Sequence, residues 1–212
     1  MTHKMDRRVR RTRKLLGEAL VRLLGERGME EITIREITEE ADVAYSTFFR
    51  NFESKEGLLL AYLEGHLRLL QAEIGTVEGS LRRQVRQNME VVFRYVLRER
   101  PLWVVLLRVP SAQPALKQFE AGLVGMNLRY LDGYRGVIRG DVPLELVVMS
   151  GVGQLVVMLE WWLWPEVREG VTAEVMVDYY EQMVVEPMWR LLVGEEVMRA
   201  ILDGDEASGN VR

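Results

Sequence analysis

Apolar residues recur at intervals of three and four along most of the chain, which is the periodicity of amphipathic helices. The first such stretch, at about residues 7–27, is followed by Gly28, a residue type that commonly ends a helix. The same pattern predicts further helices at residues 33–41, 45–52, 55–74, 80–98, 101–109, 115–135, 144–164 and 172–193. No segment alternates apolar and polar residues as a half-buried strand does. The sequence therefore predicts an all-α protein of about nine helices.

Helix-start signals and prolines support these boundaries. A T-x-x-E capping box begins at Thr33 and predicts the start of the second helix. Pro101, Pro114 and Pro143 fall where first-turn prolines are common. Pro187 lies inside the last predicted helix, so a kink or a break is expected there.

The stretch LVVMSGVGQLVVMLEWWLW, residues 146–164, is almost long enough to span a bilayer. Gln154 and Glu160 interrupt it, no second stretch of this kind exists, and its flanks carry no topology signal. A helix that is apolar almost all round is also typical of one covered by protein on both faces. We therefore expect an interface helix and no membrane association.

Positive charge is concentrated at the start of the chain. Residues 1–27 contain nine Lys or Arg and three Asp or Glu, although the whole chain has a net charge of −4. A basic segment on an acidic body fits a protein that contacts a polyanion with one end only. A solvated charged helix that binds nothing has the same composition, so this alternative stays open.

Composition excludes several kinds of chemistry. The chain has no cysteine, which excludes disulfides, thiolate metal sites and cysteine nucleophiles. Its two histidines, His3 and His66, argue against a histidine-based metal or triad site. No phosphate-binding glycine loop or convincing carboxylate pair occurs, so we predict no cofactor, no metal and no enzymatic activity. The basic N-terminus lacks the apolar stretch of a signal peptide, which predicts a cytoplasmic protein.

Residues 32–63, ITIREITEEADVAYSTFFRNFESKEGLLLAYL, have the layout of a helix-turn-helix followed by a support helix. In the second helix Phe48 and Phe52 are four positions apart and therefore share a face. Tyr45 and Ser46 stand at the exposed N-terminal end of that helix. A helix of this kind presents its first turn and one flank to a DNA major groove, while the opposite face holds it to the domain.

This stretch resembles the tetracycline-repressor (TetR) family of transcriptional regulators. The resemblance rests on a threonine-capped helix, a turn, a short helix ending in aromatic-x-x-phenylalanine and a serine/lysine-led helix, which here are Thr33, Ala41-Asp42-Val43, Thr47 to Phe52, and Ser54-Lys55-Glu56. It covers roughly residues 10–65. Beyond them only the number of helices and Glu160-Trp161-Trp162-Leu163, which looks like the family's dimerising eighth helix, are similar.

Three positions depart from the family's pattern. Asp42 stands in place of the usual turn glycine, and aspartate tolerates a left-handed backbone better than most residues. Ala44 replaces a usual serine, so a helix N-cap is lost or comes from elsewhere. Phe49 replaces a tyrosine whose hydroxyl commonly meets a DNA phosphate, so that hydrogen bond is lost, while contact with a sugar or a thymine methyl remains open to Phe49.

Resemblance and helix geometry together suggest the residues that contact DNA. Phosphate contacts are expected for Thr33, Thr47, Arg50 and Lys55, and base contacts for Tyr45, Ser46 and Arg35, with Phe49 beside them. Each has a simpler interpretation as well. Capping alone explains Thr33, and Arg50 and Lys55 would be unremarkable as solvated charges.

The resemblance implies a sensor and dimerisation lobe after the DNA-binding part. Effector-lining candidates are Tyr95, Trp103, Arg108, Met126, Tyr130, Met149 and Met158, although such residues at helical spacing are more often plain core. The helices near 144–164 and 172–193 would form a four-helix bundle with a second copy. Candidates for that dimer interface are Trp161, Trp162, Tyr179, Met183 and Trp189.

The predicted organisation is a three-helix DNA-binding domain followed by a helical ligand-binding and dimerisation domain. Its boundaries are 1–54 for the helix-turn-helix domain, 55–74 for a connecting helix, 75–204 for the second domain and 205–212 for a flexible tail. The predicted function is a homodimeric, ligand-responsive repressor on a palindromic operator. A transcriptional activator of the same fold, or a helical carrier or enzyme without a DNA role, are the alternatives.

Overall fold

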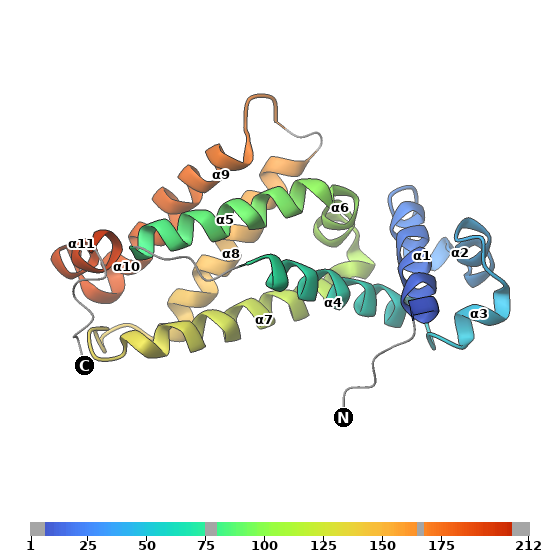
Figure 1. Ribbon diagram of the computed structural model, residues 1–212, viewed down its shortest axis with the longest axis horizontal. Coiled ribbons are helices and arrows are strands. Elements are labelled where there is room, and N and C mark those ends of the chain that lie inside the picture. The colour runs from blue at the N-terminus through green and yellow to red at the C-terminus, as the bar shows by residue number, and fades with distance from the viewer. Residues whose placement is uncertain (1–6, 75–79, 165–167, 205–212) are drawn as a thin grey trace. The chain divides into compact units, whose positions relative to one another are not determined.

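The structure is a computed structural model that describes residues 7–74, 80–164 and 168–204. Within these ranges every regular element is helical, which confirms the predicted all-α class (Figure 1). The chain divides into two compact units, one made of residues 1–71 with 99–117 and the other of 72–98 with 118–212. Residues 99–117, which the predicted boundaries place in the second domain, therefore belong with the N-terminal unit. The predicted tail at 205–212 lies outside the described residues.

The first unit is built around the N-terminal helix. Its elements are α1 (Arg7–Leu24), the 3-10 turn η1 (Met29–Glu31), α2 (Ile34–Glu40), α3 (Tyr45–Phe49), α4 (Lys55–Glu73) and α6 (Arg100–Arg108). The apolar stripe of α1, with Leu16 and Leu20 fully buried, packs against α2 and α6. Gly17 is needed where α1 meets α4, because an added Cβ would lie only 2.1 Å from the ring of Tyr62.

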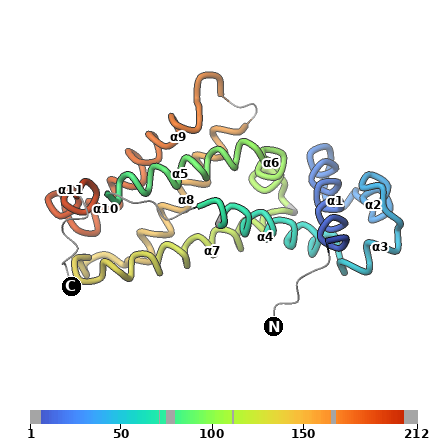
Figure 2. Tube along the Cα trace, in the orientation of Figure 1, coloured from blue at the N-terminus to red at the C-terminus, as the bar shows by residue number. Residues whose placement is uncertain are grey.

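The second unit is a bundle whose helices can be followed in Figures 1 and 2. Its elements are α5 (Leu81–Arg98), most of α7 (Gln113–Leu131), α8 (Leu144–Leu163), α9 (Ala173–Tyr180), α10 (Glu186–Val193) and α11 (Glu195–Asp203). Phe93 of α5 packs edge-to-face on Trp162 of α8, with ring centroids 5.7 Å apart. Trp189 of α10 lies in a second buried cluster, and its ring contacts Tyr134 at 5.0 Å.

The interruption expected at Pro187 is a π-helical turn, Glu181–Val185, between α9 and α10. Proline has no N–H to donate, and its ring clashes with the carbonyl one turn earlier in an α-helix. The wider π turn avoids this conflict, and the N–H of Glu186 bonds to the carbonyl of Glu181.

Helix α11 was not predicted from the sequence. Gly194, with φ of +85°, ends α10 and lets a new helix begin at once, without the polar loop that usually separates two helices. The apolar residues of α11, among them Met198 and Leu202, are buried against the second unit.

Among the described residues, α8 alone is long and apolar enough to cross a membrane by length and composition. Half of its most apolar window is buried inside the protein. The other half leaves an exposed apolar face on α8.

Glu181, in the π turn, is buried between two arginines of α5. Its carboxylate accepts hydrogen bonds from Arg82 and Arg86. Arg82 also bonds Asp203 of α11 at 2.6 Å, and Arg86 bonds Asp178 of α9 at 2.6 Å. The two guanidinium groups therefore connect α5 to α9, the π turn and α11, and they neutralise the one acidic side chain buried there.

We expect Glu181→Gln to lower the free energy of unfolding by about 1–3 kcal/mol, since charge-assisted hydrogen bonds to both arginines are lost. The arginines keep other acidic partners, which limits the loss. Urea denaturation measures it. Glu196→Gln, on the exposed side of α11, is the matched control and should change stability by less than about 0.5 kcal/mol. Equal effects of the two substitutions would contradict the structural role of Glu181.

Candidate nucleic-acid interface

Helix α2 starts with the predicted capping box. The Thr33 hydroxyl accepts a hydrogen bond from the Glu36 N–H at 3.2 Å, and the Glu36 carboxylate accepts one from the Thr33 N–H at 2.7 Å. The hydrogen bonds that the carboxylate accepts from the Thr33 N–H, the Thr33 hydroxyl and Arg27 lower the pKa of Glu36 to about 2. Capping therefore accounts for the presence of Thr33, whose side chain nevertheless stays exposed.

The turn between α2 and α3 tolerates both departures from the family's pattern. Asp42 has φ of +51°, the left-handed conformation in which glycine is favoured and aspartate is accepted. The Val43 N–H bonds to the Thr38 carbonyl at 2.9 Å and closes the turn. Ala44 occupies the N-cap of α3 and supplies no side-chain hydrogen bond, so the cap is missing as predicted.

Helix α3 has one buried face and one exposed face. Phe48 is fully buried and Phe52, just after the helix, is 7% exposed. The exposed side chains are Tyr45, Ser46, Phe49 and Arg50, which we call the reading face. Thr47 is only half-buried, and its carbonyl accepts a hydrogen bond from the Asn51 side chain at 2.8 Å. The helix is shorter than predicted, since it ends at Phe49 and residues 50 and 51 form a turn.

Lys55 has partners within the protein. Its ammonium group donates to the carbonyl oxygens of Met29 and Ile32, both at 2.6 Å. These bonds tie the start of α4 to the segment that precedes Thr33. One of the three ammonium N–H groups is left for a phosphate, so the predicted phosphate contact of Lys55 stays a prediction. The structural role of Lys55 was not predicted from the sequence.

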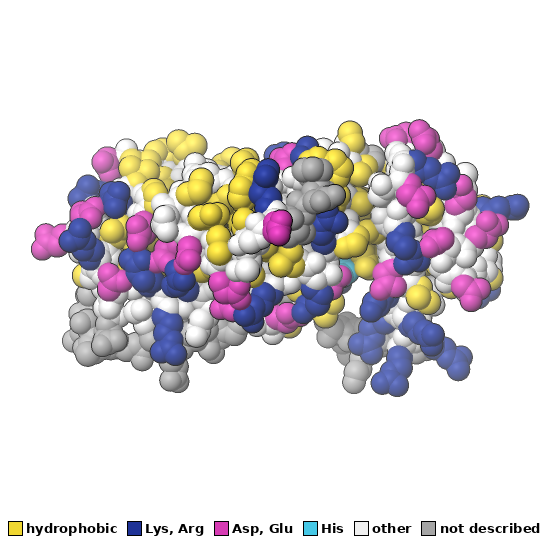
Figure 3. All heavy atoms as spheres, turned by 90° about the horizontal axis from the view of Figure 1, so that it is seen from above, with side chains coloured by type: hydrophobic (Ala, Val, Ile, Leu, Met, Phe, Trp, Pro, Cys, Tyr) yellow, Lys and Arg dark blue, Asp and Glu magenta, His cyan; other side chains and the backbone are white. Residues whose placement is uncertain are grey.

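Basic residues of α1 lie next to the turn of the helix-turn-helix. A pocket of about 510 Å³ is lined by Arg8, Arg11, Thr12, Leu15, Ala41 and Asp42. Figure 3 shows Lys and Arg side chains gathered on this part of the first unit. The basic N-terminal run signalled this cluster, but only the fold shows that α1 brings it to Asp42. Arg35, on α2, is exposed as a base contact would require.

The comparisons with known proteins agree with this geometry. Residues 16–62 match the model of the family described as bacterial regulatory proteins, tetR family. The uncharacterized HTH-type transcriptional regulator YvkB of Bacillus subtilis (strain 168) is 37% identical over 73 residues, which span 34% of this chain and 39% of that protein. Over residues 16–62, which contain the helix-turn-helix, the chain is therefore similar to bacterial regulatory proteins of the tetR family.

Solved structures of TetR-family regulators share the fold along most of the chain. A putative member from Syntrophomonas wolfei has a TM-score of 0.71 at 22% identity, covering 88% of this chain and 99% of that one. FadR from Bacillus subtilis, solved in complex with stearoyl-CoA, has a TM-score of 0.60 at 16% identity, covering 85% and 98%. At these identities the similarity is one of fold.

The effector-lining candidates fall into two groups. Tyr95, Trp103 and Met158 are buried core side chains, whereas Arg108, Met126, Tyr130 and Met149 are exposed. Trp103 and Arg108 belong to the first unit and the other five to the second. Their assignment to an effector site stays a prediction.

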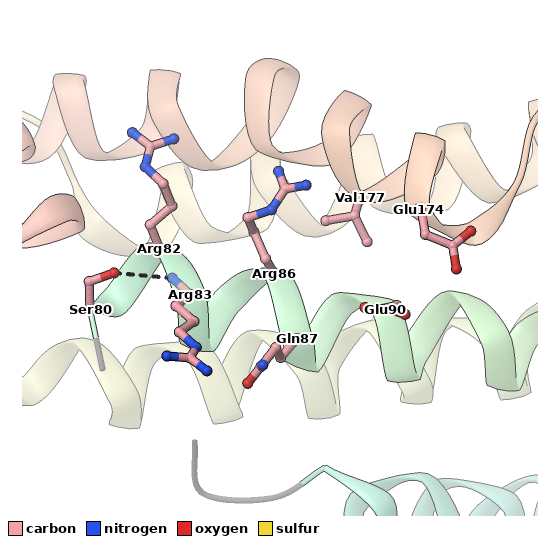
Figure 4. A pocket seen from close by; sticks show the side chains of 8 residues that line it. All are labelled: Ser80, Arg82, Arg83, Arg86, Gln87, Glu90, Glu174 and Val177. Carbon is pink, nitrogen blue, oxygen red and sulfur yellow. Dashed lines mark hydrogen bonds between the residues drawn. The ribbon is translucent and has the colours of Figure 1, made fainter. Parts of the chain in front are cut away.

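A pocket of the second unit, lined mainly by charged and polar residues, was not predicted. It has a volume of about 320 Å³ and is lined by Ser80, Arg82, Arg83, Arg86, Gln87, Glu90, Glu174 and Val177. Figure 4 shows Arg82 and Arg86 extending from α5 toward the neighbouring helices, while Arg83 points away from them. Arg82 and Arg86 already bind the acidic side chains of Glu181, Asp203 and Asp178. These two arginines therefore have a structural role, which is to connect α5 to its neighbouring helices.

The dimer-interface candidates also divide. Trp161, Tyr179 and Met183 are exposed, and the rings of Trp161 and Tyr179 meet at 6.4 Å, which joins α8 and α9 into one surface. Trp162 and Trp189 are 0% and 2% exposed, so the prediction that they contact a partner is wrong. A helix that is apolar almost all round does not reveal from its sequence which side faces its own core.

The hydrogen bonds from Lys55 to the carbonyl groups of Met29 and Ile32 can be tested by measuring both stability and DNA affinity. Lys55→Met keeps the aliphatic part of the side chain and removes the ammonium group, so we expect a loss of about 2 kcal/mol in urea denaturation. If the remaining N–H reaches a phosphate, the slope of log affinity against log salt also falls by about 0.9.

Arg50→Gln is the matched control, because Arg50 lies on the reading face and has no ion pair within the described residues. It should leave stability unchanged and reduce the slope. Unchanged stability in Lys55→Met would contradict the role of the carbonyl bonds. An unchanged slope would remove Lys55 from the phosphate contacts.

Proposed function

We propose that this protein is a cytoplasmic, ligand-responsive transcriptional repressor that binds a palindromic DNA operator as a homodimer. A small apolar or amphipathic effector would release it from DNA. The observation that carries the proposal is the reading face of α3. Its exposed side chains lie on a helix held to the domain by Phe48, within residues 16–62, which match a family of bacterial regulatory proteins.

The reading face has the chemistry that a major groove requires. Tyr45 and Ser46 offer hydroxyl groups at the N-terminal end of α3, where base edges are reached first. Thr47 and Arg50 are suited to flanking phosphates, and phosphate contacts set the register of a protein on DNA. Thr33 and Arg35, both exposed at the start of α2, would add to these contacts.

The exposed apolar face of α8 supports a homodimer. Its outward residues are Leu146, Met149, Ser150, Gly153, Gln154, Val157 and Trp161, which recur every three or four positions along one side of the helix. Val157 is 64% exposed and Leu146 61%, values that are costly for a helix facing water. A second copy would cover this face with its own α8, as an isologous two-fold interface requires. The two reading faces of such a dimer would be related by a two-fold axis, so the operator is expected to contain two inverted half-sites.

A structure that shares this fold guides the choice of effector compounds. The structure of FadR from Bacillus subtilis, which shares this fold, contains stearoyl-CoA. We therefore include stearoyl-CoA among the first compounds for release assays, beside apolar compounds of smaller size. An effector that binds the DNA-free form preferentially lowers the protein's affinity for operator DNA. By reciprocity, operator DNA lowers the protein's affinity for the effector by the same factor.

Operator binding can be tested by selection from a random-sequence DNA duplex library. We expect enrichment of inverted repeats, and an affinity for them that falls steeply with salt, as release of counterions from phosphates requires. Repression predicts that the protein lowers transcription in vitro from a promoter overlapping the selected site. A selected pool that binds no better than random DNA would contradict the proposal.

Dimerisation can be tested separately with Val157→Glu. A charge at the centre of the α8 face should convert the dimer to a monomer in analytical ultracentrifugation, because an unpaired carboxylate would be buried between the copies. Operator affinity should fall with it. Gln87→Glu, on the exposed side of α5, is the control and should leave the dimer intact. A wild-type monomer, or a Val157→Glu dimer, would refute this interface.

A further inference from the structure

Two aromatic rings stand exposed in the middle of the reading face. Tyr45 and Phe49 are each 52% exposed, and their rings meet edge-to-face with centroids 5.3 Å apart. Phe49 also contacts the ring of Phe48 at 5.5 Å, and Phe48 is fully buried. The Phe49 ring is therefore supported on two sides, by its exposed neighbour and by the core, while its remaining surface faces outward.

The position of Phe49 places it among the residues proposed to read bases. Tyr45 and Ser46 precede it by four and three positions, so all three share one side of the helix. Arg50 is next to it in sequence and carries the charge suited to a phosphate. A ring in this position enters the groove together with the hydroxyl groups of Tyr45 and Ser46.

A phenyl ring has no hydrogen-bond donor or acceptor, which limits what it can recognise. The largest apolar group that base pairs present in the major groove is the C5-methyl group of thymine, and most of the remaining edge is polar. Pressing a ring against polar edges would remove water from them without replacing its hydrogen bonds, which is unfavourable. A thymine methyl loses nothing in this exchange and gains the burial of apolar surface.

We propose that Phe49, held in place by Tyr45 and Phe48, is a specificity-determining residue that recognises the C5-methyl group of one thymine in each operator half-site. The inference rests on the proposed DNA binding and adds to it the chemical group that the reading face selects. It also gives a function to the loss of the tyrosine hydroxyl at this position. The ring contributes sequence preference where a hydroxyl would have contributed a phosphate contact.

The test replaces thymine by deoxyuridine, one position at a time, in the duplex selected from the random library. This change removes the methyl group and leaves the base pairing intact. We expect one position in each half-site at which wild-type affinity falls about fourfold, the effect of removing one buried methyl group. Phe49→Ala should bind the thymine and deoxyuridine duplexes equally, which measures the coupling between ring and methyl directly.

Two further variants separate the ring's role from general effects. Phe49→Leu keeps an apolar side chain and should retain part of the sensitivity to deoxyuridine. Ser46→Ala alters the same face without touching the ring, and should keep the full fourfold difference at that position. Thermal unfolding of each variant checks the fold, which we expect to be kept because the Phe49 ring is half-exposed.

The outcomes are distinguishable. Wild-type affinity that is the same for every deoxyuridine duplex would overturn the recognition of a methyl group while leaving operator binding intact. If Phe49→Ala still binds the thymine duplex about fourfold more tightly than the deoxyuridine duplex, the ring does not contact that methyl group and the inference is wrong. Failure to select any operator would overturn the proposed function itself, and this inference with it.

Discussion

The burial of Phe48 is the interaction on which the DNA-binding unit depends. Helix α3 has five residues, and a helix of that length is not stable by itself in water. With its ring fully buried, Phe48 fixes both the position of α3 and its rotation about its own axis. The Phe48 carbonyl also accepts the N–H groups of Asn51 and Phe52 at 2.8 and 2.9 Å, which closes the turn that follows. The opposite side of the helix is thereby turned to solvent.

Charged groups around this helix serve folding as much as recognition. Glu36 closes the capping box of α2, and Lys55 binds two carbonyl groups of the segment before it. The segment from Met29 to Thr33 is therefore held by the charged side chains of Lys55 and Glu36, which from the sequence alone resemble ordinary surface charges. A DNA-binding unit gains from this arrangement, because a reading face selects bases only if its supports hold it still.

Local signals explain what could be predicted from the sequence. The capping box at Thr33 and the spacing of Phe48 and Phe52 involve residues three and four apart, so the pattern alone determines their geometry. The bonds of Lys55 could not be predicted, because its partners lie 23 and 26 residues away and are backbone atoms. In the second unit, apolar residues occur on almost every side of α8, so the sequence pattern does not show which side is buried. Only the packing of α8 against its neighbours shows that Trp162 faces inward.

The central claim is that the outward side of α3 is the surface that meets DNA. The most direct measurement is the change in backbone amide NMR signals when the selected operator is added. We expect the largest changes at Tyr45, Ser46, Phe49 and Arg50, with smaller ones at the start of α2. Unchanged signals in α3, with changes confined to other surfaces of the protein, would contradict it.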